Sequence, residues 1–269
     1  MLIVDSQIHL WANPGGPPHH RQEPYTVNLA LADMDSAGVA RAINCPAIWD
    51  AQANGYSVEA ARQHPNRFAT LGWFPLGVPR TKEEIAQFLD RPGMLGLRFV
   101  VMRPEDVAAL QAGELDWLWQ AAHDLARPVA LIVPKPVLPE LGKLADRFPQ
   151  ISFLLDHLNI GPMEKLPAAM DHLETLLALA AHPNIAIKAS ATPSMSNEPY
   201  PFGDVSPYLE QIFVAYGPER MFWGTDFTRM RIELSACVEM FTEHLPWLKG
   251  DDLESVMGRA ICHWLDWPI

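Results

Sequence analysis

The chain has 269 residues, of which 49% are hydrophobic and 19% are charged, and its formal net charge is −12. This composition is typical of a soluble globular protein, and the length suits either two small domains or one large α/β domain. The negative charge argues against a nucleic-acid backbone or an anionic membrane surface as a partner. No apolar run approaches the roughly 20 residues that a membrane-spanning helix requires.

The three cysteines and the N-terminus indicate a cytoplasmic location. Cys45, Cys237 and Cys262 are widely spaced and odd in number, and none belongs to a CxxC pair. A disulfide framework is therefore not expected, and a reduced compartment is the simplest interpretation. The N-terminus lacks the basic stretch and the apolar core of a signal peptide.

Eight apolar runs rich in β-branched residues predict eight β-strands. The expected strands cover residues 2–9, 41–48, 68–74, 96–102, 128–133, 151–157, 185–191 and 221–226. Amphipathic segments between them have apolar residues at helical spacing. The expected helices cover residues 28–38, 81–90, 115–126, 139–148, 166–181 and 205–217, with two more in the tail at 233–244 and 251–265.

This alternation predicts parallel strands joined by crossover helices. Eight such units in about 250 residues match the size of a (β/α)8 TIM barrel, so residues 1–269 are expected to form a single α/β barrel domain. The alternative is a doubly wound open sheet. Such a sheet usually has a GxGxxG loop after its first strand, and this sequence has none.

Two long irregular segments, residues 11–27 and 192–204, follow the first and the seventh expected strands. In a barrel these segments lie at the catalytic end, so both are expected to cover the substrate. His19 and His20 lie in the first segment. Two histidines in a Pro-rich loop are more often a solvated surface than a metal site, so we expect this pair to be exposed.

Polar side chains gather where the expected strands end. They are Gln7, His9, Arg98, His157, Lys188, Ser190, Asp226, Arg229 and Arg231. An imidazole or a carboxylate at the rim of an apolar barrel costs free energy unless it binds a partner. Along the first strand, Asp5, Gln7 and His9 alternate, so all three are expected to point to one side.

Several of these residues lie in motifs that resemble the amidohydrolase superfamily, in its amidohydrolase-2 branch. The motifs are IVDSQIHLW (3–11), NLALADMDSAGVARAI (28–43), LLDHLNIG (154–161), FWGTDFTR (222–229) and VMGRAICHWL (256–265). They occur in the family's order over nearly the whole chain. Within the branch, the chain is most similar to sugar lactonases and pyrone-dicarboxylate lactonase. The resemblance implies a barrel that acts as a hydrolase.

The resemblance also implies a divalent-metal site, which this sequence matches in part. The family's first strand normally ends in HxH; His9 matches the second histidine, and Gln7 replaces the first. The family's strand-five histidine is also absent from VALIVPKP. The remaining candidate ligands, His9, His157 and Asp226, are enough for zinc or manganese with water in a fourth position. They suit a metal-free site equally, because the lactonase relatives have weak or absent metal dependence.

The residue types predict a mechanism and a set of substrate contacts. Asp226 would activate water as a general base, and His9 and His157 would polarise the scissile carbonyl, directly or through a metal. Arg98 would bind a substrate carboxylate bidentately. Further expected substrate contacts are Gln7, Trp11, Tyr25, Lys188 and Arg229, with Arg231 as an alternative to Arg229.

Three functions fit these residues, each with a small molecule as the partner. The first is hydrolysis of a small carboxylated or sugar-like lactone, an ester or a C–N bond. The second is non-oxidative decarboxylation or hydration on the same barrel. The third is a catalytically silent barrel that binds a small acid. The apolar C-terminal residues 262–269 are expected to cover either the barrel base or a second copy of the chain.

Overall fold

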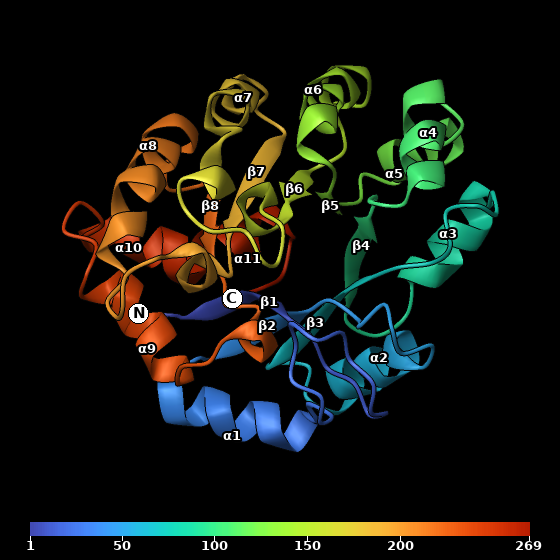
Figure 1. Ribbon diagram of the computed structural model, residues 1–269. Helices are drawn as coiled ribbons and strands as arrows, with labels where there is room; N and C mark the ends of the chain where they lie inside the picture. The colour runs from blue at the N-terminus through green and yellow to red at the C-terminus, as the bar shows by residue number, and fades with distance from the viewer.

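Eight parallel strands surround a central axis in the computed structural model, which describes residues 1–269 (Figure 1). Each strand pairs with the next one along the chain. The strands are β1 (Val4–Ile8), β2 (Arg41–Asn44), β3 (Phe68–Gly72), β4 (Met94–Val100), β5 (Val129–Ile132), β6 (Phe153–Leu155), β7 (Ile185–Ala189) and β8 (Met221–Trp223). The predicted (β/α)8 barrel is confirmed.

The helices form a ring outside the strands, except that α11 lies across one end of the barrel (Figure 1). They are α1 (Val27–Ala37), α2 (Ala53–Gln63), α3 (Lys82–Leu89), α4 (Pro104–Ala112), α5 (Asp116–Asp124), α6 (Leu138–Arg147), α7 (Leu173–Ala178), α8 (Ser206–Tyr216), α9 (Leu234–Thr242), α10 (Gly250–Glu254) and α11 (Ala260–Trp264). Helices α2 and α4 were not predicted from the sequence. The helix predicted over 166–181 is instead the short α7 with a 3-10 turn on each side.

Local signals explain where several helices begin and end. Thr26 caps α1 by accepting a hydrogen bond from the backbone of Leu29, and Gly38 ends this helix in a left-handed conformation. Thr81 and Glu84 form a reciprocal capping box at the start of α3. By contrast, the residue before α2, Gln52, makes no side-chain cap. This missing signal is one reason why α2 was not predicted.

Apolar side chains pack in two layers, one inside the barrel and one between the strands and the helices. The inner cluster joins strand residues such as Leu71, Leu154 and Phe222 to Ile261 and Leu265 of the C-terminal segment. Gly258 approaches the backbone of Leu2, just before β1, so this segment lies at the N-terminal end of the strands. The C-terminal residues therefore cover the barrel base, which leaves the opposite end for a binding site.

Side chains complete the junction between β8 and β1. The backbone N–H and the hydroxyl of Thr225 both donate to the Asp5 carboxylate, at 2.8 and 2.5 Å. The pairing of β1 with β2 shifts register between Asp5 and Ile8, which breaks the strict alternation of side chains along β1. The prediction that Asp5 shares a face with Gln7 and His9 is therefore wrong. Asp5 lies at this junction and does not line the cavity described below.

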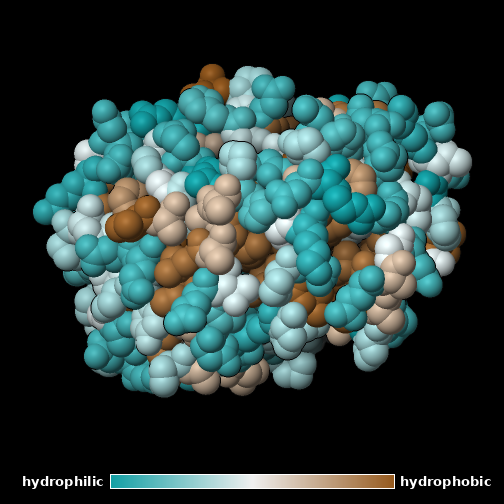
Figure 2. Space-filling model, turned by 90° about the horizontal axis from the view of Figure 1, so that it is seen from above, coloured by the Kyte–Doolittle hydropathy of each residue, from teal (hydrophilic) through white to brown (hydrophobic).

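The surface seen from above Figure 1 is mostly hydrophilic, and its hydrophobic residues gather in the hollows (Figure 2). No helix combines the length and the apolar character that crossing a bilayer requires. A few large apolar side chains are nevertheless well exposed, among them Ile48 and Met102. Both lie on loops at the C-terminal ends of strands, and both line the cavity described below.

Candidate active site

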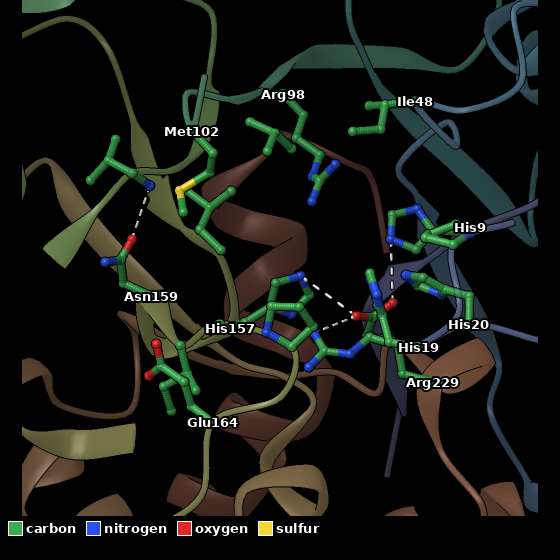
Figure 3. A pocket seen from close by; sticks show the side chains of 18 of the residues that line it. His9, His19, His20, Ile48, Arg98, Met102, His157, Asn159, Glu164 and Arg229 are labelled. Carbon is green, nitrogen blue, oxygen red and sulfur yellow. Dashed lines mark hydrogen bonds and ion pairs between the residues drawn. The ribbon is translucent and has the colours of Figure 1, made fainter. Parts of the chain in front are cut away.

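A cavity of about 600 Å³ opens at the C-terminal ends of the strands (Figure 3). Its size is typical of sites for small organic ligands. Five side chains predicted from the sequence meet there: His9, Arg98, His157, Asp226 and Arg229. The other predicted contacts, Gln7, Trp11, Tyr25, Lys188 and Arg231, do not line this cavity.

Asp226 lines the cavity, and its carboxylate lies beside nitrogen atoms of three other side chains. Its Oδ1 is 3.3 Å from Nε2 of His9, and its Oδ2 is 3.1 Å from Nη1 of Arg229. Nε2 of His157 lies 3.7 Å from Oδ2. Burial alone would raise the pKa of Asp226, but the surrounding imidazoles and guanidinium outweigh it and hold that pKa well below its usual value. Asp226 is therefore an ionised carboxylate.

The backbone is left-handed where several functional side chains leave the strands. Non-glycine residues with positive φ include His157 (53°) and Asn159 (57°) after β6, Ala191 (59°) after β7 and Asp226 (51°) after β8. Such conformations cost about 1–3 kcal/mol each when they are strained, and they cluster at functional sites. Here the unusual backbone turns His157 and Asp226 towards each other across the cavity.

The hydrogen bonding of His9 defines its ring nitrogens. Nδ1 lies 2.5 Å from the carbonyl oxygen of Cys45, and a carbonyl only accepts, so Nδ1 carries a proton. In a neutral ring, Nε2 then presents a lone pair to Oδ1 of Asp226, 3.3 Å away. Two electron-rich atoms at that distance repel each other unless a proton or a cation lies between them. Oδ1 is also buried and has no hydrogen-bond partner.

His20 lies beside this pair, on the loop between β1 and α1 (Figure 3). Its side chain is buried, and its Nδ1 is 2.7 Å from the hydroxyl of Thr228. One ligand atom from each of His9, His20 and Asp226 lies within 4.8 Å of the others. Two imidazoles and a carboxylate, each ring anchored through its second nitrogen, form a donor set that fits a divalent ion such as zinc or manganese.

Two sequence-based expectations change here. His20 was expected to be exposed, but only 8% of it is accessible. In the group that fits a metal, His20 takes the place assigned to His157. The loop folds back so that the N–H of Arg21 donates to the carbonyl of Thr228 at 2.8 Å. No local sequence pattern predicts this long-range hydrogen bond. Burial lowers the pKa of His20 to about 3, so its ring is neutral and has a free lone pair.

His157 is a neutral imidazole beside the carboxylate. Burial lowers its pKa to about 3, although the neighbouring Asp226 acts in the opposite direction. Its Nδ1 is 2.8 Å from the hydroxyl of Ser190. When Ser190 donates to Nδ1, the proton of the ring is on Nε2, which faces the cavity side of Asp226. His157 is then a hydrogen-bond donor next to the proposed base.

A buried polar network lies under the cavity and explains Gln7. Lys188 places its Nζ 3.0 Å from Oδ1 of Asp156 and donates to Oε1 of Gln7 at 2.8 Å. Cys45 also donates to that oxygen, at 3.1 Å. A buried lysine needs such partners, because removing a charge from water costs several kcal/mol. Gln7 and Lys188 therefore support the floor of the site instead of reaching the cavity.

The same network orients Arg98. Its Nε donates to Oδ2 of Asp156 at 2.7 Å, and the residue is only 5% exposed. Its two terminal nitrogens make no hydrogen bond within the protein. The guanidinium points into the cavity (Figure 3). Arg98 thus presents two parallel N–H donors to a ligand, the geometry that binds a carboxylate bidentately.

The aromatic wall differs from the predicted one. Trp11 and Tyr25 are almost completely buried and pack behind the cavity, with ring centroids 6.5 Å apart. Trp49 packs against Trp11 and lines the cavity in its place. Trp49 also contacts the rings of His9 and His20. Trp49 follows β2 and was not among the site residues predicted from the sequence.

Comparisons with known proteins agree with this architecture. The family described as "Amidohydrolase" matches residues 4–254. An L-fucono-1,5-lactonase of Burkholderia ambifaria is 27% identical over 242 residues, covering 85% of this chain and 81% of the relative. An amidohydrolase of Burkholderia multivorans with bound zinc has a TM-score of 0.82 at 17% identity, covering 100% of both chains. A probable 2-pyrone-4,6-dicarboxylic acid hydrolase of Acinetobacter baumannii, with citric acid bound, has a TM-score of 0.80 at 14% identity, covering 99% of this chain and 100% of that one.

Proposed function

The chain belongs to the amidohydrolase family and is a hydrolase, and from this premise we propose that it opens a small anionic lactone or ester by attack of an activated water. The observation that carries the proposal is the position of Asp226. An ionised, buried carboxylate lies within 3.7 Å of two imidazoles, in a cavity that Arg98 also lines. A base, neutral donors and an anion-binding group therefore converge where a carbonyl would bind.

The proposed reaction needs one water and no redox partner. Asp226 takes a proton from a water molecule while the oxygen of that water forms a bond to the scissile carbonyl carbon. His157 donates from Nε2 to the carbonyl oxygen, which becomes negative in the tetrahedral intermediate. The C–O bond to the leaving oxygen then breaks, and the proton held on Asp226 passes to that oxygen. The products are a carboxylic acid and an alcohol, joined in one chain if the substrate is a lactone.

We further propose that His9, His20 and Asp226 hold a divalent ion, zinc or manganese. Such an ion, when bound, polarises a carbonyl and lowers the pKa of water. Without an ion, a proton shared between Nε2 of His9 and Oδ1 of Asp226 would remove the repulsion between these facing atoms. In both states Asp226 is anionic, and His157 and Arg98 keep the tasks described above.

Charge in the site favours an anionic substrate. The cations Arg98, Lys188 and Arg229 face only two carboxylates, those of Asp156 and Asp226. One positive charge therefore remains uncompensated in a protein whose total charge is −12. The terminal nitrogens of Arg98 make no hydrogen bond within the protein and face the cavity (Figure 3). A substrate carboxylate bound there would hold the neighbouring carbonyl near Asp226.

We expect purified protein to release one proton for each lactone opened, and to release no carbon dioxide. A pH-indicator assay on small carboxylated lactones would measure the first product, and coupled detection of bicarbonate would measure the second. A decarboxylase on the same barrel would use Arg98 for the same carboxylate but would yield carbon dioxide from an aromatic acid. Release of carbon dioxide without lactone opening would contradict the proposal.

The pH dependence of the reaction follows from the lowered pKa of Asp226. The usual pKa of an aspartate is near 4. Because the pKa of Asp226 is lower, its side chain stays ionised at pH values above this range, and it becomes protonated only when the pH falls through the lower, folded-state pKa. We therefore expect kcat/KM to show no limb due to Asp226 between about pH 5 and pH 8. Initial rates over this range, at constant ionic strength, measure the profile. A loss of activity near pH 6 that disappears in the Asp226→Asn variant would contradict it.

A further inference from the structure

The cavity has two chemically different halves. The polar half contains Asp226 and the imidazoles around it. The other half is lined by apolar side chains from loops and strand ends after β2, β4, β5 and β6: Ile48, Val100, Met102, Ile132, Val133 and Ile160. Arg98 lies between the halves, and Ile48 and Met102 lie on either side of it in the view of Figure 3. A ligand that fills the cavity therefore meets a cation at one point and hydrocarbon beyond it.

Most polar side-chain groups within the apolar half already have partners in the protein. The carbonyl oxygen of the Asn159 side chain accepts from the N–H of Val133 at 3.1 Å. The ammonium of Lys135 lies 2.6 Å from Glu164. The Asn159 amide nitrogen is the one group of these that lacks a partner. A sugar ring carries several hydroxyl groups, and most of them would lose water there without gaining a hydrogen bond.

The rim of the same half is apolar and accessible. Ile48 and Met102 are each 47% exposed, although both line the cavity. Exposed apolar side chains that converge on a cavity are typical of a surface that a ligand covers. A second carboxylate on the substrate would lie in this apolar half, where the cation Lys135 is already paired with Glu164 and Asp171.

We infer that the substrate is a monoanionic lactone or ester whose remaining body is apolar, an aryl or alkyl group, and is neither a sugar lactone nor a dicarboxylate. This inference rests on the proposed function for the position of the scissile bond. The substrate carboxylate contacts Arg98, the scissile carbonyl faces Asp226, and the apolar body lies against Met102 and Ile48. Selectivity arises because the apolar half favours hydrocarbon and leaves hydroxyl groups unpaired.

Equilibrium binding tests this inference without requiring turnover. Isothermal titration calorimetry with the wild-type protein would compare 3-phenylpropanoate with benzylmalonate, which adds one carboxylate, and with gluconate, a polyhydroxylated acid. We expect 3-phenylpropanoate to bind at least about tenfold more tightly than either competitor. Equal or tighter binding of gluconate or benzylmalonate would overturn the inference, as would failure of 3-phenylpropanoate to bind.

A matched pair of variants locates the effect. Met102→Gln keeps the length of the side chain and makes it polar, and it is expected to weaken 3-phenylpropanoate binding by about five- to tenfold. Met163→Gln is the same change at a residue that is 79% exposed and outside this cavity, so the affinity should stay the same. Equal effects of the two variants would contradict the proposed position of the apolar body.

The binding data also separate this inference from the proposed function. Selective binding of 3-phenylpropanoate by a protein that hydrolyses no lactone would support the apolar half and refute the hydrolysis. Efficient opening of sugar lactones, with tight binding of gluconate, would support the hydrolysis and refute the apolar substrate. Each proposal can therefore fail without the other.

Discussion

Replacing Asp226 by asparagine is expected to lower kcat/KM for lactone opening by about 10²–10⁴-fold, the usual contribution of a positioned general base. Asparagine preserves the shape of the side chain and tolerates the left-handed backbone, where φ is 51°. It cannot accept a proton from water. Steady-state kinetics on the best lactone would measure the loss, and calorimetry with 3-phenylpropanoate would show whether the ligand still binds.

Asp266→Asn provides a matched control for this experiment. Asp266 also has a positive φ, 52°, but it is exposed and lies in the C-terminal segment that covers the barrel base. The same chemical change there should leave both kcat and KM unchanged. If Asp226→Asn retains activity within about tenfold of the wild type, another group is the base. If binding and activity are lost together, Asp226 positions the substrate and is not only a base.

The barrel and the positions of its strand-end residues were predictable because they depend on local patterns. Eight apolar runs at regular intervals fix the order of the strands, and Arg98, His157 and Asp226 each come close to the end of such a run. The C-terminal ends of parallel strands meet at one end of a barrel. These residues therefore come together in the structure although they are far apart in the chain.

The depth of each side chain was less predictable. Gln7 lies on β1 and His9 directly follows that strand, yet His9 lines the cavity and Gln7 lies beneath it, bonded to Lys188. The register shift within β1 and the buried charge of Asp156 decide this arrangement. Neither is visible in a single sequence, because both depend on which strand lies opposite. Trp11 was misplaced for the same reason: alternation predicts a side, not a depth.

His20 shows a different limit of sequence analysis. A Pro-rich loop with two adjacent histidines gives no periodic signal, and only its contacts with Thr228, after β8, distinguish the two rings. His20 is buried against Thr228, whereas His19 is partly exposed and contributes no atom to the group that fits a metal. The loop thus supplies an imidazole to the cavity, whereas Gln7 does not line it.

Replacing His20 by alanine is accordingly expected to weaken zinc binding by at least about 100-fold. Loss of an outer partner of a metal ligand already costs 10–100-fold in affinity, so loss of a direct ligand should cost no less. Competition with a chromophoric chelator would measure the affinity, and the visible spectrum of the cobalt form would report the coordination. Both readouts are independent of catalytic activity.

His19→Ala and His157→Ala make this experiment decisive. His19 is adjacent in sequence and its ring lies 4.7 Å from that of His20, so its removal tests whether any change in the loop is enough to lose the metal. His157 is the ligand that the sequence alone suggested. Neither change is expected to alter zinc affinity by more than a few-fold. If His157→Ala abolishes binding and His20→Ala does not, the sequence-based ligand set is correct. If the wild type binds no zinc or manganese, the proposed metal site is wrong, and His20 has no metal to hold.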